Sequence, residues 1–216
     1  MTDKKQKNRR AYHHGNLKAA LIDVAQRLIV ERGPHGFTLV EAAKLAGVSP
    51  AAPYRHFSSR EALLAEVARS GYENFSTRLE DAWDGGTPNP VTAFRRMGDV
   101  YLDFARYERA SYIAMFEAGL VHNEVDGLKS SADKAFSVLT NAASALGGKM
   151  PDGTPIPPEM LGAHIWAMSH GMATLFASTE KFSDQRLKGD MKALFESGTA
   201  IYLRGLGIDV PPINDE

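Results

Sequence analysis

The chain has 216 residues, of which 44% are hydrophobic, so it is long enough for one or two domains with a sizeable core. It has no cysteine, which excludes disulfides and thiolate chemistry and favours a reducing compartment such as the cytoplasm. No apolar run approaches the ~18 residues of a membrane span, and no apolar stretch follows the basic start as in a secretory signal, so we expect no membrane association.

A formal net charge of −1 hides a strong asymmetry along the chain. Residues 1–60 contain 11 Lys and Arg against 4 Asp and Glu, a net charge of +7, whereas the remaining residues carry −8. Such a bias predicts a surface that faces a polyanion. A solvated tail is the alternative, because five of the positive charges belong to Lys4, Lys5, Lys7, Arg9 and Arg10.

The first helical pattern spans residues 16–32, where apolar residues recur at spacings of three and four until Gly33 and Pro34 end the run. Thr38 and Glu41 then have the spacing of a capping box. They predict a second helix of barely two turns that ends at Gly47.

A third short helix is expected to follow, with Ser49 as its cap and Pro50 at its first position, where the missing N–H is harmless. We expect Leu45, Val48 and Phe57 to pack the second and third helices together. These two helices joined by a sharp turn form a helix-turn-helix, the arrangement that presents its second helix to the DNA major groove.

A long fourth helix follows. Ser58 and Glu61 form another capping-box pair at its start, and "DGGTPNP" breaks it after Trp83. Further helices are predicted over 91–108, 110–121, 127–147, 157–181 and 187–206. Neither strand alternation nor an internal repeat is evident, so we predict an all-α fold of about nine helices, with the domain division inside the fourth helix.

The outward groups of the helix-turn-helix suit a DNA duplex. Thr38 and Ser49 lie at predicted helix N-termini, where backbone N–H groups favour phosphate oxygens. The Tyr54 hydroxyl, together with the charges of His56 and Arg60, would add further phosphate contacts. The candidates for reading bases are Ala51, Ala52 and Arg55, with Pro50 beside them, because alanine methyls can touch thymine methyls and Arg55 can bind guanine bidentately. A helix-turn-helix used only for packing is the alternative.

Three segments closely resemble the TetR (tetracycline-repressor-like) family of transcriptional regulators: "TLVEAAKLAGVS" (38–49), "YRHF" (54–57) and "REALL" (60–64). In "IWAMSHGMATL" (165–175), Trp166, His170 and Gly171 resemble the Trp-His-Gly signature of one subgroup of the family. The sequence departs from the family pattern at Ala42, Ala51 and Pro53.

The resemblance implies a basic flexible arm over 1–14, a DNA-binding domain over 15–64 and a helical ligand-binding and dimerisation domain over 65–216. In the arm, Arg9 and Arg10 would enter a minor groove; simple disorder of this segment is the alternative. We also expect the last two long helices to pair with their symmetry mates in a homodimer, the alternative being a core helix pair within one chain.

A small hydrophobic or aromatic effector is expected in the C-terminal domain, where a mostly apolar cavity would carry a few polar groups. The candidate ligand-binding residues are Tyr101, Phe104, Met115, Phe116, Trp166 and His170. Ordinary core packing is the alternative for each of them.

Signs of an enzyme are missing from the sequence. It lacks a catalytic constellation and a phosphate-binding glycine loop, and we expect neither a cofactor nor a metal, since His164 and His170 are six positions apart and point to different helix faces. We therefore predict a cytoplasmic, homodimeric regulator that represses transcription from a palindromic DNA operator and responds to a ligand. The alternatives are a constitutive DNA-binding regulator or activator without an inducer, and an enzyme with an incidental basic end.

Overall fold

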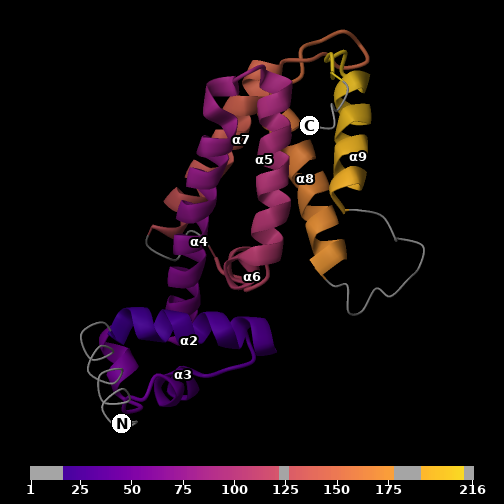
Figure 1. The fold of residues 1–216 in the computed structure, drawn as a ribbon. Coiled ribbons are helices and arrows are strands. Elements are labelled where there is room, and N and C mark those ends of the chain that lie inside the picture. Colours follow the sequence, from indigo (N-terminus) through magenta and orange to yellow (C-terminus); the bar gives the residue numbers. More distant parts are fainter. Residues whose placement is uncertain (1–16, 122–126, 178–190, 212–216) are drawn as a thin grey trace, which may run out of the picture. The chain divides into compact units, whose positions relative to one another are not determined.

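The structure is a computed structural model that describes residues 17–121, 127–177 and 191–211 (Figure 1). Within these ranges it consists of helices and loops, with one isolated β-bridge between Lys149 and Pro155 and no strand. The predicted all-α fold, with a helix-turn-helix near the N-terminus followed by longer helices, is confirmed. The predicted arm over 1–14 and the ends of two predicted helices, 178–181 and 187–190, lie outside the described residues.

The α-helices are α2 (Leu17–Arg32), α3 (Leu39–Leu45), α4 (Arg60–Trp83), α5 (Pro90–Tyr107), α6 (Arg109–Phe116), α7 (Leu128–Leu146), α8 (Pro158–Ala177) and α9 (Met191–Gly205). Two single-turn 3₁₀ helices, η1 (Ala52–Arg55) and η2 (Asp84–Gly86), lie between them. The helix predicted over 110–121 is shorter than expected, because the chain leaves the helix after Phe116 and Gly119 adopts a φ of +64°.

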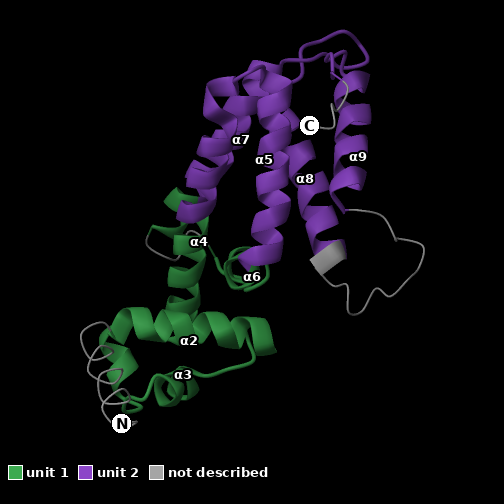
Figure 2. Ribbon diagram, viewed as in Figure 1, with its two compact units in different colours: residues 1–72, 109–131 green, residues 73–108, 132–216 purple. Residues whose placement is uncertain are grey.

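The chain divides into two compact units, drawn in different colours in Figure 2. Unit 1 contains the described residues of 1–72 and 109–131, and unit 2 those of 73–108 and 132–216. The boundary falls inside α4, so this helix contributes its first half to one core and its second half to the other.

The core of unit 1 forms where α2, α4 and α6 pack together. Leu21, Val24, Leu28 and Ile29 share one buried face of α2, as the apolar spacing predicts. Close packing of α4 on α6 depends on Gly71, because a Cβ there would lie only 2.8 Å from the Met115 sulfur.

In unit 2, α5 is the central helix and packs against α8 and α9. Phe94, Met97, Tyr101 and Phe104 lie on its buried face. Gly98 lies on the same helix against α9, where a Cβ would overlap the Phe195 ring and lie 2.8 Å from its Cζ. The absence of a side chain at this position therefore sets how closely α5 and α9 approach.

Candidate nucleic-acid interface and ligand site

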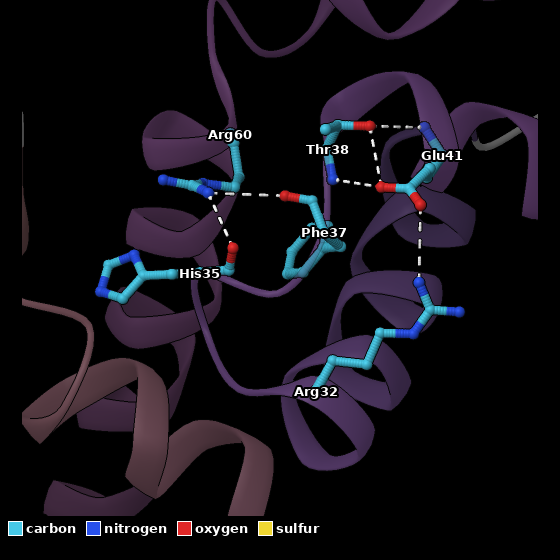
Figure 3. Close-up of polar contacts among 6 residues, drawn as sticks. All are labelled: Arg32, His35, Phe37, Thr38, Glu41 and Arg60. Carbon is cyan, nitrogen blue, oxygen red and sulfur yellow. Dashed lines mark hydrogen bonds and ion pairs between the residues drawn. The ribbon is translucent and has the colours of Figure 1, made fainter.

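The start of α3 is fixed by the predicted capping box (Figure 3). The Thr38 hydroxyl accepts a hydrogen bond from the Glu41 amide at 3.2 Å, and the Thr38 amide donates to Glu41 Oε2 at 2.8 Å. This amide donation is the main reason why the pKa of Glu41 lies below its usual value; the Thr38 hydroxyl and Arg32, whose guanidinium lies 3.5 Å from Oε1, lower it further. The direction in which α3 leaves the preceding loop is thus set by paired local hydrogen bonds.

The third helix of the motif differs from the prediction. It is η1, a single 3₁₀ turn whose N-cap is Ala51 without a side-chain hydrogen bond, so Ser49 is not the cap and Pro50 precedes the helix. The turn closes through hydrogen bonds from the Ala52 amide to the Ser49 carbonyl (3.0 Å) and from the His56 amide to the Pro53 carbonyl (2.9 Å). Pro53 removes the amide donor that an α-helix capped by Ser49 would need at its fourth position, which is why a longer α-helix does not form here.

Burial separates the residues of this turn into two groups. Pro53 and Phe57 are buried and anchor the segment. Tyr54 is 56% exposed, and its neighbours Arg55 and His56 are exposed with it. The structure therefore leaves these three predicted DNA contacts exposed on one short turn, as it does Ser49, Pro50 and Ala51, whereas Ala52 is half-buried.

Leu45 does not pack the two helices together as predicted, since it is 57% exposed. The buried residues of α3 are Leu39, Ala42 and Ala43. Leu45 follows Ala43 by two positions, which places it roughly 200° around the helix from that buried residue.

The beginning of α4 is also corrected. The side chain that caps it is Ser59 rather than Ser58, because Ser59 Oγ accepts from the Ala62 amide at 3.2 Å. Arg60, the first residue of α4, turns its guanidinium toward the loop that joins α2 to α3 (Figure 3). It donates to the carbonyl oxygens of His35 (3.2 Å) and Phe37 (3.5 Å), so it takes part in the internal structure of the motif.

An ion-pair cluster that the sequence did not reveal joins α2 to α4. Glu66 Oε1 lies 2.6 Å from the Lys18 ammonium and 2.8 Å from Arg69 Nη2. The hydrogen bond from Arg69 is the largest cause that lowers the pKa of Glu66 to about 2, and Lys18 adds to it. The cluster joins the N-terminal end of α2 to α4.

Three of the predicted ligand-binding residues lie together in unit 2. The Tyr101 hydroxyl and His170 Nδ1 are 3.0 Å apart, and the Trp166 ring centroid lies 5.9 Å from that of His170. Phe136 of α7, which the sequence reasoning missed, extends the group, since its ring meets that of Trp166 edge-on at 6.4 Å. Trp166 and Phe136 are both exposed.

The other three candidates are packed in their own units. Phe104 of unit 2 is buried against the Phe75 ring at 4.9 Å, and the Arg78 guanidinium lies 5.8 Å from its centroid. Met115 belongs to unit 1, where its carbonyl accepts from the Tyr72 hydroxyl at 3.3 Å, and Phe116 of the same unit stacks edge-on against Tyr72. Phe116 is half-buried, and the ligand-binding role of these three residues stays a prediction.

Unit 2 contains a small cavity of about 10 Å³ that Thr199 helps to line, and the buried Thr199 hydroxyl has no hydrogen-bond partner among the described residues. That volume suits about one water molecule. Among the described residues, no three acidic or histidine side chains gather as a metal site would need. None of the described helices is long and apolar enough to cross a membrane.

Two family models match the chain. The model of bacterial regulatory proteins of the tetR family matches residues 21–67, and that of the tetracyclin repressor-like C-terminal domain matches residues 94–202, half of the chain by itself. The chain therefore belongs to the TetR family and is a DNA-binding transcriptional regulator.

Two relatives are HTH-type transcriptional regulators. BetI from Rhizobium meliloti (strain 1021) is 43% identical over 53 residues, which are 24% of this chain and 26% of BetI. RutR from Escherichia coli O157:H7 is 28% identical over 180 residues, which are 81% of this chain and 82% of RutR. The first likeness is thus local and strong, and the second covers most of both chains.

Solved structures show the same fold. A protein of unknown function from Rhodococcus sp. RHA1 is 25% identical and has a TM-score of 0.73. The match covers 90% of this chain and 97% of the Rhodococcus chain. AibR, solved in complex with isovaleryl coenzyme A and operator DNA, is 20% identical with a TM-score of 0.61, over 85% of this chain and 96% of its own.

Proposed function

We propose that this regulator acts in the cytoplasm as a homodimer that represses transcription, binds a palindromic operator and releases it when a small hydrophobic or aromatic ligand binds. Residues 15–64 would bind DNA, and residues 65–216 would dimerise and bind the ligand. The observation that carries the proposal is the exposed turn at η1, where Tyr54, Arg55 and His56 are exposed while the anchors Pro53 and Phe57 are buried.

On DNA, η1 of each subunit would enter the major groove, and the two half-sites would lie ~34–36 Å apart. Tyr54 and His56 would contact phosphates, as would Thr38 and Ser49 near the start of each short helix. Arg55 would bind a guanine edge, and the small residues Pro50, Ala51 and Ala52 would allow close approach to the bases. Arg9 and Arg10 of the basic arm would reach an adjacent minor groove.

Dimerisation through α8 and α9 is supported by apolar side chains left exposed on both helices. On α8 these are Met160 and Leu175, and on α9 they are Leu194 and Ile201, the last of which is 72% exposed. Gly171 leaves open space on α8, since, apart from its own stretch of helix, no described atom lies within 4 Å of a Cβ built there. A second copy that packs this surface against its own would form a four-helix interface with the same residues on both sides.

The effector would bind beside Tyr101, His170 and Trp166. The hydroxyl and the imidazole supply hydrogen-bonding groups, and the indole with Phe136 supplies an aromatic wall, which together suit an aromatic or hydrophobic molecule with one polar end. Assignment to the Trp-His-Gly subgroup is part of the same proposal. The AibR complex supports the pairing of a ligand with operator binding, as a property of that protein.

Selection of genomic DNA fragments with the purified protein tests the proposal. We expect enrichment of a palindromic sequence that the Arg55→Ala variant binds with less preference at one position per half-site, by about 1–3 kcal/mol. Equal weakening on every sequence would make Arg55 a phosphate contact. An operator complex that no compound releases would favour a constitutive regulator, and turnover of a bound compound without operator binding would favour an enzyme.

A further inference from the structure

The guanidinium of Arg60 makes hydrogen bonds within the helix-turn-helix, whereas an arginine that contacts DNA would keep its donors free for phosphate. Nε and Nη2 donate to Glu61 Oε1 at 3.1 and 2.6 Å. Nη1 donates to the carbonyl oxygens of His35 and Phe37 at 3.2 and 3.5 Å, as Figure 3 shows. All three nitrogens therefore already have acceptors in the protein, and the Arg60 side chain is only 28% exposed.

These acceptors lie on both sides of the motif. His35 and Phe37 belong to the loop between α2 and α3, 25 and 23 residues before Arg60. Thr38, the next residue, is the N-cap of α3, so the carbonyl that Arg60 holds is adjacent to the residue that fixes where α3 begins. The 3₁₀ turn η1, of which Pro53 is buried, packs in turn on α3.

We propose that Arg60 is a positioning residue that acts on DNA recognition by clamping the α2–α3 loop to the start of α4, rather than by touching phosphate. This inference rests on the proposed function, and it explains what holds the turn with Tyr54, Arg55 and His56 in position for DNA. The clamp consists of the Arg60 guanidinium, the Glu61 carboxylate and the His35 and Phe37 carbonyls. Because Glu61 neutralises the guanidinium locally, the clamp adds little to the attraction of DNA phosphates.

Lysine cannot reproduce the clamp. The planar guanidinium presents its donors in a fork, so it reaches Glu61 on one side and two carbonyls on the other, whereas an ammonium is a single compact point of charge. A phosphate contact has the opposite requirement, since lysine supplies the same charge to a phosphate. The Arg60→Lys variant therefore separates positioning from charge.

The test measures operator and random-DNA affinity for the wild type, Arg60→Lys, Arg60→Gln and a charge-matched control, Arg27→Gln, at several salt concentrations. Arg27 is exposed on α2 and takes no part in the clamp. We expect both Arg60 variants to lose operator affinity by about tenfold, the effect of one charged hydrogen bond. In Arg60→Lys, which keeps the charge, random-DNA affinity and salt slope should match those of the wild type, and in Arg60→Gln random-DNA affinity should fall no more than in Arg27→Gln. Wild-type affinity in Arg60→Lys, with a salt slope flattened by ~0.9 in Arg60→Gln, would overturn the clamp and make Arg60 a phosphate contact.

Glu61→Gln gives a different answer for each of the two roles. If Glu61 anchors the clamp, its replacement lowers the ratio of operator affinity to random-DNA affinity. If Arg60 touches phosphate, removing the neighbouring carboxylate strengthens binding to operator and random DNA alike and leaves that ratio unchanged, which would overturn the clamp.

Hydrogen exchange of the Thr38 amide tests the clamp without DNA. We expect faster exchange in Arg60→Lys than in the wild type, and wild-type exchange in Arg27→Gln. Equal rates in all three proteins would overturn the clamp. Because the measurement needs no DNA, its result does not depend on whether the protein binds an operator.

Discussion

Replacing Glu66 with Gln should destabilise the protein by an amount that depends on pH. Hydrogen bonds from Arg69, and then Lys18, lower the pKa of Glu66 from 4.5 to about 2. At 1.36 kcal/mol per pH unit, this difference corresponds to roughly 3 kcal/mol. Lys18 and Arg69 are 45% and 31% exposed, so solvent screening reduces the expected loss at pH 7 to about 1–2 kcal/mol.

The pH profile identifies the cause. Because the pKa of Glu66 is lower in the folded chain than in the unfolded one, its stabilisation is present above pH 4.5 and is lost as the pH falls toward 2. Urea unfolding of the wild type and Glu66→Gln, followed by circular dichroism from pH 7 to pH 3, should show two stabilities that converge in acid. Glu31→Gln, an exposed carboxylate on α2, should match the wild type throughout. A gap between wild type and Glu66→Gln that stays constant from pH 7 to pH 3 would refute the electrostatic reasoning, since it would point to lost packing.

Other changes test separate parts of the structure. Gly98→Ala should lower the free energy of unfolding by about 1–3 kcal/mol, because its Cβ overlaps the Phe195 ring; Gly162→Ala, whose Cβ would make ordinary contacts at 3.4 and 3.6 Å, should not, and equal effects would contradict the packing. Thr38→Ala should cost about 1 kcal/mol through loss of the α3 cap, and unchanged stability in urea would remove that role from the hydroxyl. Ile201→Asp should convert a dimer to monomers in sedimentation velocity without unfolding; an unchanged dimer would place the interface elsewhere.

Local patterns in the sequence predicted local structure well. Thr38 and Glu41 form their capping box because both partners lie within one helical turn, and the apolar spacing of α2 marks its buried face because that face follows from helix geometry alone. Sequence reasoning failed in the same region where two local signals competed. A Ser-Pro start predicted an α-helix at Ser49, but the second proline, at 53, left a single 3₁₀ turn.

The features that sequence could not reveal involve partners distant in the chain. The acceptors of Arg60 are backbone carbonyls more than 20 residues away, and a carbonyl leaves no trace in the residue type. Lys18 pairs with Glu66 across two helices, and Gly98 is required by a ring on α9. An arginine after a serine cap looks the same in sequence whether it faces solvent or folds back, so Arg60 was predicted as a phosphate contact alone.

Hydroxyl-radical footprinting on the selected operator is the most direct test that the turn with Tyr54, Arg55 and His56 binds the DNA groove once from each subunit of a dimer. We predict two protected patches on one face of the duplex, centred 10–10.5 base pairs or a multiple of that apart, each lost in Tyr54→Ala/Arg55→Ala protein. One continuous protected stretch, or the same footprint from the double variant, would contradict the central claim.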